Sequence, residues 1–284
     1  MVYFIWPSLH AELQAITIHW LSLLKKHGWH TPLDEICYST TAFDWQYTND
    51  IIISDEVIKR IPRKTGFKVL GTFITFDNAF DVELVRRIAA SWSAFSKFAS
   101  LLKCREISLE SRLRMFAKAV HPAMLWCAGS WNLRKNQLAT LREQQRRMLR
   151  KMIGFKKLDT EDLENFMRRT NTTMNNLMAV HKVKTWDLLA HRAVFRWAGT
   201  VTRISISYPD RWTTTVFQHK DWRWIQTIAR ENNGRQLHCR KLKTWRWERP
   251  LYKYLGENWQ DEAADLDNWK SMENDFLEWR SRNR

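Results

Sequence analysis

The sequence is poor in the residues that interrupt or cross-link a chain. Its 284 residues include only eight glycines, six prolines and four cysteines. So few turn-forming residues favour long helices over a fold of many short strands and turns. The cysteines at positions 37, 104, 127 and 239 include no close pair, which excludes a disulfide scaffold. We therefore expect an intracellular protein of the nucleus or cytoplasm, where thiols stay reduced.

Long apolar runs and an early basic cluster are also missing. No stretch approaches the ~20 apolar residues that a membrane-spanning helix needs. The first basic residue is Lys25, so the start of the chain lacks the charge of a secretory signal. Apolar residues nevertheless make up 44% of the sequence, which is enough for a hydrophobic core and excludes a mostly disordered chain.

Acidic residues are scarce relative to basic ones. The chain has 30 Asp and Glu against 46 Lys and Arg, a formal net charge of +16. Residues 97–157, which we call the basic segment, contain fifteen basic and three acidic residues, and residues 218–253 contain ten and three. Clustered positive charge is typical of a phosphate-binding surface, although it also occurs on solvated helix faces. We expect an RNA or DNA duplex as partner, no membrane and no small-molecule substrate.

The spacing of apolar residues predicts a mostly α fold with a small antiparallel β-hairpin region near the N-terminus. Strand-prone residues occur between positions 35 and 75, whereas the pattern from about residue 80 onward is helical. Helices are predicted at 8–27, from 80 to 102, from Ser108 toward Pro122, and at 136–153, 160–169, 173–199, 221–232 and 258–280. The expected regions are 1–79, with one helix and β hairpins, a helical region at 80–157, and a Trp-rich helical region at 158–284.

The predicted helix at 136–153 has the clearest amphipathic pattern. Leu138, Leu141, Met148 and Met152 fall on one side and predict the buried face. The other side carries basic residues, which we expect to point outward: Arg142, Arg146, Arg147, Arg150 and Lys151. Because Arg142, Arg146 and Arg150 are spaced by four, they form a row about 12 Å long. That row is our first candidate for contact with phosphates.

Seventeen tryptophans are an unusual number, and several stand beside arginine. Such pairs can hold single strands, with bases stacked on indole and arginine at the phosphates. Indole at helical spacing is also typical of a protein core. For the acidic tail, which contains Trp259, Trp269, Phe276 and Trp279, we expect core packing.

Several short motifs follow one another in a recognisable order. Residues 67–74 read FKVLGTFI, residues 144–154 read QQRRMLRKMIG, residues 195–203 read FRWAGTVTR, and residues 245–248 read WRWE. In order and spacing they resemble the end of the palm, the thumb and the downstream region of reverse transcriptases of non-LTR (LINE-type) retrotransposons. The resemblance implies a helical thumb-like bundle over 80–157.

The resemblance also implies particular binding residues. A hairpin that grips the primer end corresponds to Phe67, Lys68, Val69, Leu70 and Gly71. Contacts with nucleic acid are expected from Arg112, Arg114, Lys118, Arg142, Arg146, Arg147, Arg150 and Lys151.

The carboxylates of polymerase chemistry are missing from this sequence. The family holds divalent metal ions with paired carboxylates, partly from a Tyr/Phe-x-Asp-Asp turn, and this chain has no Asp-Asp dipeptide. The resemblance therefore implies that the chain alone is inactive and carries no cofactor, with Mg²⁺ expected only together with a missing palm and fingers portion. An enzyme remains possible if another part supplies the carboxylates. The alternative is a retroelement-derived helical interaction protein without affinity for polynucleotides.

Overall fold

The computed structural model describes residues 10–39, 50–62, 65–69, 71–74, 80–209 and 247–283. Most of them lie in helices, which confirms the mostly α fold predicted from the sequence. The chain forms two compact units, an N-terminal unit (Met1–Glu83) and a C-terminal unit (Leu84–Arg284). Among the described residues, no helix has both the length and the apolar character needed to cross a membrane.

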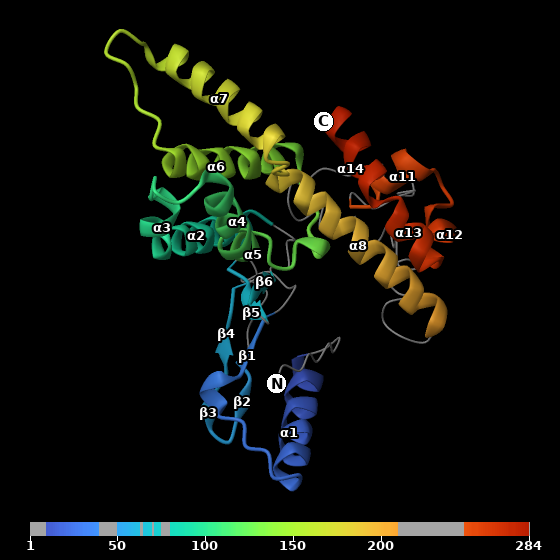
Figure 1. The fold of residues 1–284 in the computed structure, drawn as a ribbon. Coiled ribbons are helices and arrows are strands. Elements are labelled where there is room, and N and C mark those ends of the chain that lie inside the picture. Colours follow the sequence, from blue (N-terminus) through green and yellow to red (C-terminus); the bar gives the residue numbers. More distant parts are fainter. Residues whose placement is uncertain are drawn as a thin grey trace, which may run out of the picture. The chain divides into compact units, whose positions relative to one another are not determined.

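The elements are drawn in Figure 1. The helices are α1 (His10–Lys26), α2 (Phe80–Lys97), α3 (Ala99–Lys103), α4 (Leu109–Ala119), α5 (His121–Met124), α6 (Lys135–Ile153), α7 (Leu163–Val180), α8 (Trp186–Ser207), α11 (Arg249–Leu255), α12 (Trp259–Ala264), α13 (Leu266–Ser271) and α14 (Glu273–Arg282), with 3-10 turns η1 (Leu33–Glu35) and η3 (Ala128–Ser130). The strands are β1 (Cys37–Tyr38), β2 (Ile52–Ile53), β3 (Glu56–Val57), β4 (Lys59–Arg60), β5 (Phe67–Val69) and β6 (Thr72–Ile74).

The N-terminal unit has a small core of isoleucines. Ile51, Ile53 and Ile58 are buried against Leu13 and Leu21 of α1. The pairs β2–β3 and β5–β6 are antiparallel, as predicted, but β1 pairs with β4 in parallel. The prediction of antiparallel pairing alone was therefore incomplete. The chain between β1 and β4 includes the β2–β3 hairpin, and a connection of that length lets two strands run in the same direction.

Glu83 joins the β5–β6 hairpin to the start of α2 within the N-terminal unit. Its carboxylate accepts hydrogen bonds from the Thr72 hydroxyl (3.1 Å) and the Phe73 backbone N–H (2.8 Å). The side chain is only 3% exposed, so these donors compensate for the loss of water around a charge. The register of the hairpin therefore depends on this carboxylate as well as on strand pairing.

The long helix α8 organises the C-terminal unit (Figure 1). It packs against α6 and η3, which precede it in the sequence, and against α12 and α14, which follow it. Its buried residues include Trp186, Ala190, Val194 and Phe195. Because one helix contacts both groups, their packing depends on its continuous apolar surface.

The tryptophans of the tail belong to the core, as expected. Trp259 and Trp269 are 3% and 2% exposed and cluster with Phe195, Phe276 and Leu251. The Trp269 ring stacks on Phe195 at 4.0 Å, and its Nε1–H donates to the Phe195 carbonyl at 3.0 Å. A methyl group at Gly199 would overlap the Trp269 ring, so this glycine permits the close approach of α8 and α13.

Helix boundaries differ from the sequence-based predictions in three places. The helix predicted from 80 to 102 is divided at Phe98 into α2 and α3. α7 continues through the expected break near residue 170, because Thr170 and Met174 are buried on one face, and the chain turns at Lys182, whose φ is +52°. The predicted helix at 258–280 is divided into α12, α13 and α14, since the Asp265 carboxylate accepts hydrogen bonds from the backbone N–H groups that start α13. The predicted helix at 221–232 lies outside the described residues.

His121 sits among aromatic rings where α4, α5 and α8 meet. Its ring lies edge-on to Phe116 and Trp186, with centroid distances of 5.1 and 6.1 Å. Its Nε2 is buried without a hydrogen-bond partner among the described residues. Burial lowers the pKa of His121 from 6.5 to about 4. The imidazole is therefore neutral in the folded chain at neutral pH.

The lowered pKa makes stability depend on pH in one direction. Above pH 6.5 neither state protonates His121, and as the pH falls toward 4 the unfolded chain takes up the proton first. Protonation of the unfolded chain therefore lowers the free energy of unfolding. We predict that this decrease reaches about 3 kcal/mol by pH 4 and does not occur in His121→Phe. Urea unfolding of both proteins from pH 7 to 4 measures it. Parallel stability curves for the two proteins would contradict the assignment.

Candidate nucleic-acid interface

The cations of the basic segment divide into a solvent-facing group and an internal group. Of the fifteen lysines and arginines between positions 97 and 157, eleven have exposed side chains. They are Lys97, Lys103, Arg105, Arg114, Lys118, Arg134, Lys135, Arg147, Lys151, Lys156 and Lys157. All lie in the C-terminal unit, so this unit carries the candidate interface.

The arginines of the predicted row on α6 mostly have partners within the fold. Arg142 forms an ion pair with Asp187 at 2.8 Å, and that carboxylate is 3% exposed. Arg150 is 12% exposed and pairs with Glu143 at 2.7 Å, while it also donates to Asn171 at 2.9 Å. The prediction that these two arginines point outward was wrong. The helical pattern identified the buried face but did not show that α7 and α8 flank the polar face.

Arg146 completes the predicted row and is also drawn toward α7. It is half-buried and donates to the Asn175 side chain at 3.3 Å. Its Nε is buried and has no hydrogen-bond partner in the described part of the chain. The row therefore stabilises the packing of α6 against α7 and α8, and it does not form an open line of charge.

Arg147 and Lys151, by contrast, are exposed one turn apart on α6. The Lys151 ammonium lies 5.0 Å from the centre of the Trp92 ring, and the Trp92 Nε1–H donates to Gln144 at 3.0 Å. This contact aligns Lys151 over α2 while leaving its charge at the surface. The pair was predicted to face outward, and its exposure agrees with that.

Arg112 was predicted to contact nucleic acid, but the structure places it in the core. It is 8% exposed, and its guanidinium donates to the backbone carbonyls of Ile107, Leu102 and Met152. These acceptors come from the loop before α4, from α3 and from α6. A buried charge is stable only with such partners, so Arg112 connects three segments and is not available to a ligand.

The two other predicted cations of α4 are at the surface. Arg114 pairs with Glu110 one turn earlier at 2.8 Å, and both side chains are about two-thirds exposed, at 65% and 66%. Lys118 is exposed at the end of the same helix. Both side chains line a surface groove together with Phe98, Ser111, Met115 and Ala119.

The hairpin predicted to grip a primer end lies in the N-terminal unit. Lys68 is exposed, Phe67 is half-buried and Val69 is 7% exposed. Gly71 adopts a positive φ of +84°, which the turn between β5 and β6 requires. Leu70 lies outside the described residues. The hairpin therefore offers one surface cation, and its apolar residues are partly covered.

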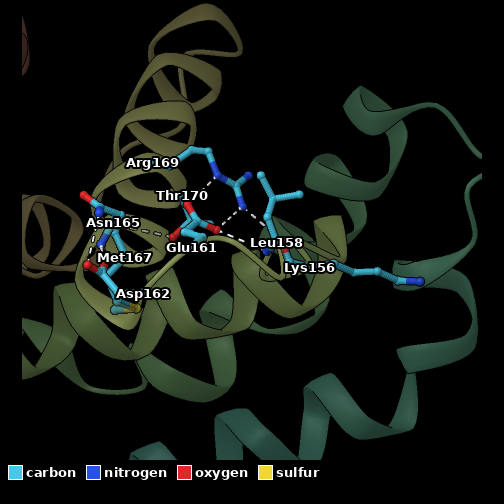
Figure 2. A network of polar contacts seen from close by, with 8 residues as sticks. All are labelled: Lys156, Leu158, Glu161, Asp162, Asn165, Met167, Arg169 and Thr170. Carbon is cyan, nitrogen blue, oxygen red and sulfur yellow. Dashed lines mark hydrogen bonds and ion pairs between the residues drawn. The ribbon is translucent and has the colours of Figure 1, made fainter.

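A polar network holds the loop that follows α6 (Figure 2). The Arg169 guanidinium bonds both carboxylate oxygens of Glu161, at 2.9 and 2.8 Å, and donates to the Lys156 carbonyl at 3.0 Å. Hydrogen bonds from Arg169 lower the pKa of Glu161, so the network is formed at neutral pH. Figure 2 shows the Lys156 side chain pointing away from these contacts. The network thus holds the backbone at Lys156, and the side chains of Lys156 and Lys157 are exposed in the loop beyond α6.

The acidic residues of the basic segment do little to offset these charges. Glu110 and Glu143 are each paired with an arginine, and Glu106 is exposed. Among the described residues, no group of His, Cys, Asp and Glu is arranged to hold a metal ion. The arrangement suits a polyanion bound by charge and hydrogen-bond donors.

No protein-family model, curated protein or solved structure matches this chain.

Arginines of α6 should respond differently to the same substitution. Arg142→Gln removes the ion-pair partner of a buried carboxylate, and we predict a loss of about 3 kcal/mol in unfolding free energy. Arg147→Gln changes an exposed side chain on the same helix and should alter it by less than about 0.5 kcal/mol. Urea unfolding followed by circular dichroism compares the two. Equal effects would show that Arg142 is not a structural residue.

Proposed function

We propose that the C-terminal unit binds a nucleic-acid duplex through its phosphates. The observation that carries the proposal is the set of eleven exposed cations in the basic segment, which are left after Arg112 and the row on α6 have taken internal partners. They lie on α2, α3, α4, α6 and the loops around them. Lysine and arginine at a surface release counterions when they meet phosphates, which favours binding without sequence preference.

The role we propose is to hold a primer–template duplex, not to catalyse its extension. The resemblance to the thumb and downstream region of LINE-type reverse transcriptases supports this role. The chain lacks an Asp-Asp pair for metal ions, so any polymerase activity would need carboxylates from another portion. Mg²⁺ would then act in that portion.

A helical interaction protein without affinity for polynucleotides is the alternative. The packing of α8 against α12 and α14 would serve such a protein equally well. Excess charge separates the two proposals, because an interaction surface for other proteins is typically depleted of lysine at its centre. The exposed lysines of the basic segment favour nucleic acid.

Two exposed cations of α6 provide a direct test of this proposal. We predict that Arg147→Gln with Lys151→Gln lowers the slope of log affinity against log salt by about two, near 0.9 for each lost phosphate contact. Anisotropy of a labelled duplex across a salt series measures the slope. Circular dichroism should show an unchanged fold, because neither guanidinium nor ammonium is buried.

A matched double variant controls for the loss of net charge. Arg168→Gln with Lys182→Gln also removes two exposed cations, but from α7 and the turn after it, outside the basic segment. Its slope should equal that of the unmodified chain. If both double variants lower the slope equally, binding reflects net charge and the proposed surface is wrong.

A further inference from the structure

The C-terminal unit has a groove of about 430 Å³ between the α2–α3 joint and α4. Its lining surface is mostly apolar, although three of its six residues are polar. Phe98, Met115 and Ala119 supply the apolar part, and Ser111, Arg114 and Lys118 supply the polar part. No carboxylate lines it among the described residues, and the Glu110 carboxylate that pairs with Arg114 lies one turn earlier on α4.

The groove lies along a face of α4 that does not pack in the core. Leu113 and Phe116 face the core, together with the Arg112 guanidinium that binds backbone carbonyls. Residues 111, 115 and 118 recur at intervals of three and four, so they form a second face of the helix that looks away from that core. Phe98 stands between the end of α2 and the start of α3 and closes the other side.

Cations surround the apolar surface. The Lys97 ammonium lies 5.8 Å from the centre of the Phe98 ring, and Arg114 and Lys118 are exposed beside Met115. A partner that suits this groove combines a flat apolar group with negative charge on either side. A nucleotide within a strand has this form, since every base has an apolar face and its neighbouring phosphates are anionic. An apolar peptide segment would bring no negative charge to these cations.

We propose that this groove binds one unpaired base of a single-stranded extension, with the flanking phosphates on Arg114 and Lys118. The inference rests on the proposed function, because it adds a single-strand site to a unit that holds a duplex. Stacking against Phe98 and Met115 provides affinity without base identity. The unit then distinguishes a duplex end with an overhang from a blunt end.

Three ligands test the proposal with the full chain. They are a blunt duplex, the same duplex with a short single-stranded extension, and that duplex with abasic sugars in the extension. We expect the extension to tighten binding about tenfold relative to the blunt duplex. The abasic extension keeps the phosphates but not the bases, so it should lose most of that gain. Equal binding of the normal and abasic extensions would show that only charge is recognised, and would overturn the proposal.

Variants locate the site. Phe98→Ala removes the ring, and Arg114→Gln with Lys118→Gln removes the charges from an exposed helix face without touching the core. Each should abolish the gain from the extension. Phe98→Ala should leave the affinity for the blunt duplex within about twofold, whereas the double variant removes two of the eleven exposed cations and should also weaken binding of the blunt duplex. Arg168→Gln is the matched control, because Arg168 also pairs with a glutamate one turn earlier at 2.8 Å and is 70% exposed. It should keep the full gain.

The outcomes separate this proposal from the one on which it rests. If the chain binds blunt and extended duplexes equally, duplex binding stands and the groove is not a base site. If it binds neither, both proposals fail. A free mononucleotide that removes the gain as effectively as a short single strand would assign the groove to soluble nucleotides, and this too would overturn the strand proposal.

Discussion

A guanidinium group enters the interior of a protein only where carbonyl or carboxylate acceptors surround it. This constraint sorts the basic side chains of the C-terminal unit. Arg112 finds three backbone carbonyls, and Arg142 finds the buried carboxylate of Asp187. These contacts tie α3, α4, α6 and α8 together. The cations without internal acceptors stay at the surface, and our functional account depends on them.

Aromatic packing holds in place the helices that carry these side chains. Phe116 and Trp186 stack with their planes 5° apart, which fixes α4 against the start of α8, and Phe195 stacks on Trp269 near the middle of α8. Most tryptophan rings of the described residues therefore pack against other side chains of the fold. For the Arg–Trp pairs at 211–212, 222–224 and 245–246, which lie outside those residues, both interpretations from the sequence remain.

Sequence patterns predicted the helices well where a terminator was local. Gly28 and Gly154 adopt positive φ after α1 and α6, and the Ser108 hydroxyl caps α4. The sequence patterns failed where a contact depends on residues that are distant in the sequence. Nothing near Arg142 in the sequence indicates that Asp187, on another helix, will pair with it, and nothing near residue 37 indicates that β1 will pair with β4. The groove beside Phe98 was missed for the same reason, because its two sides come from separate helices.

Lysine footprinting tests the central claim most directly, because it reports where a duplex touches the full chain. Acetylation in the presence and absence of a duplex is compared residue by residue by mass spectrometry. The account predicts protection of the exposed lysines at 97, 103, 118, 151 and 156, and unchanged reactivity of Lys182 and Lys270, which are exposed outside the basic segment. Equal protection of both groups, or protection of neither, would contradict it.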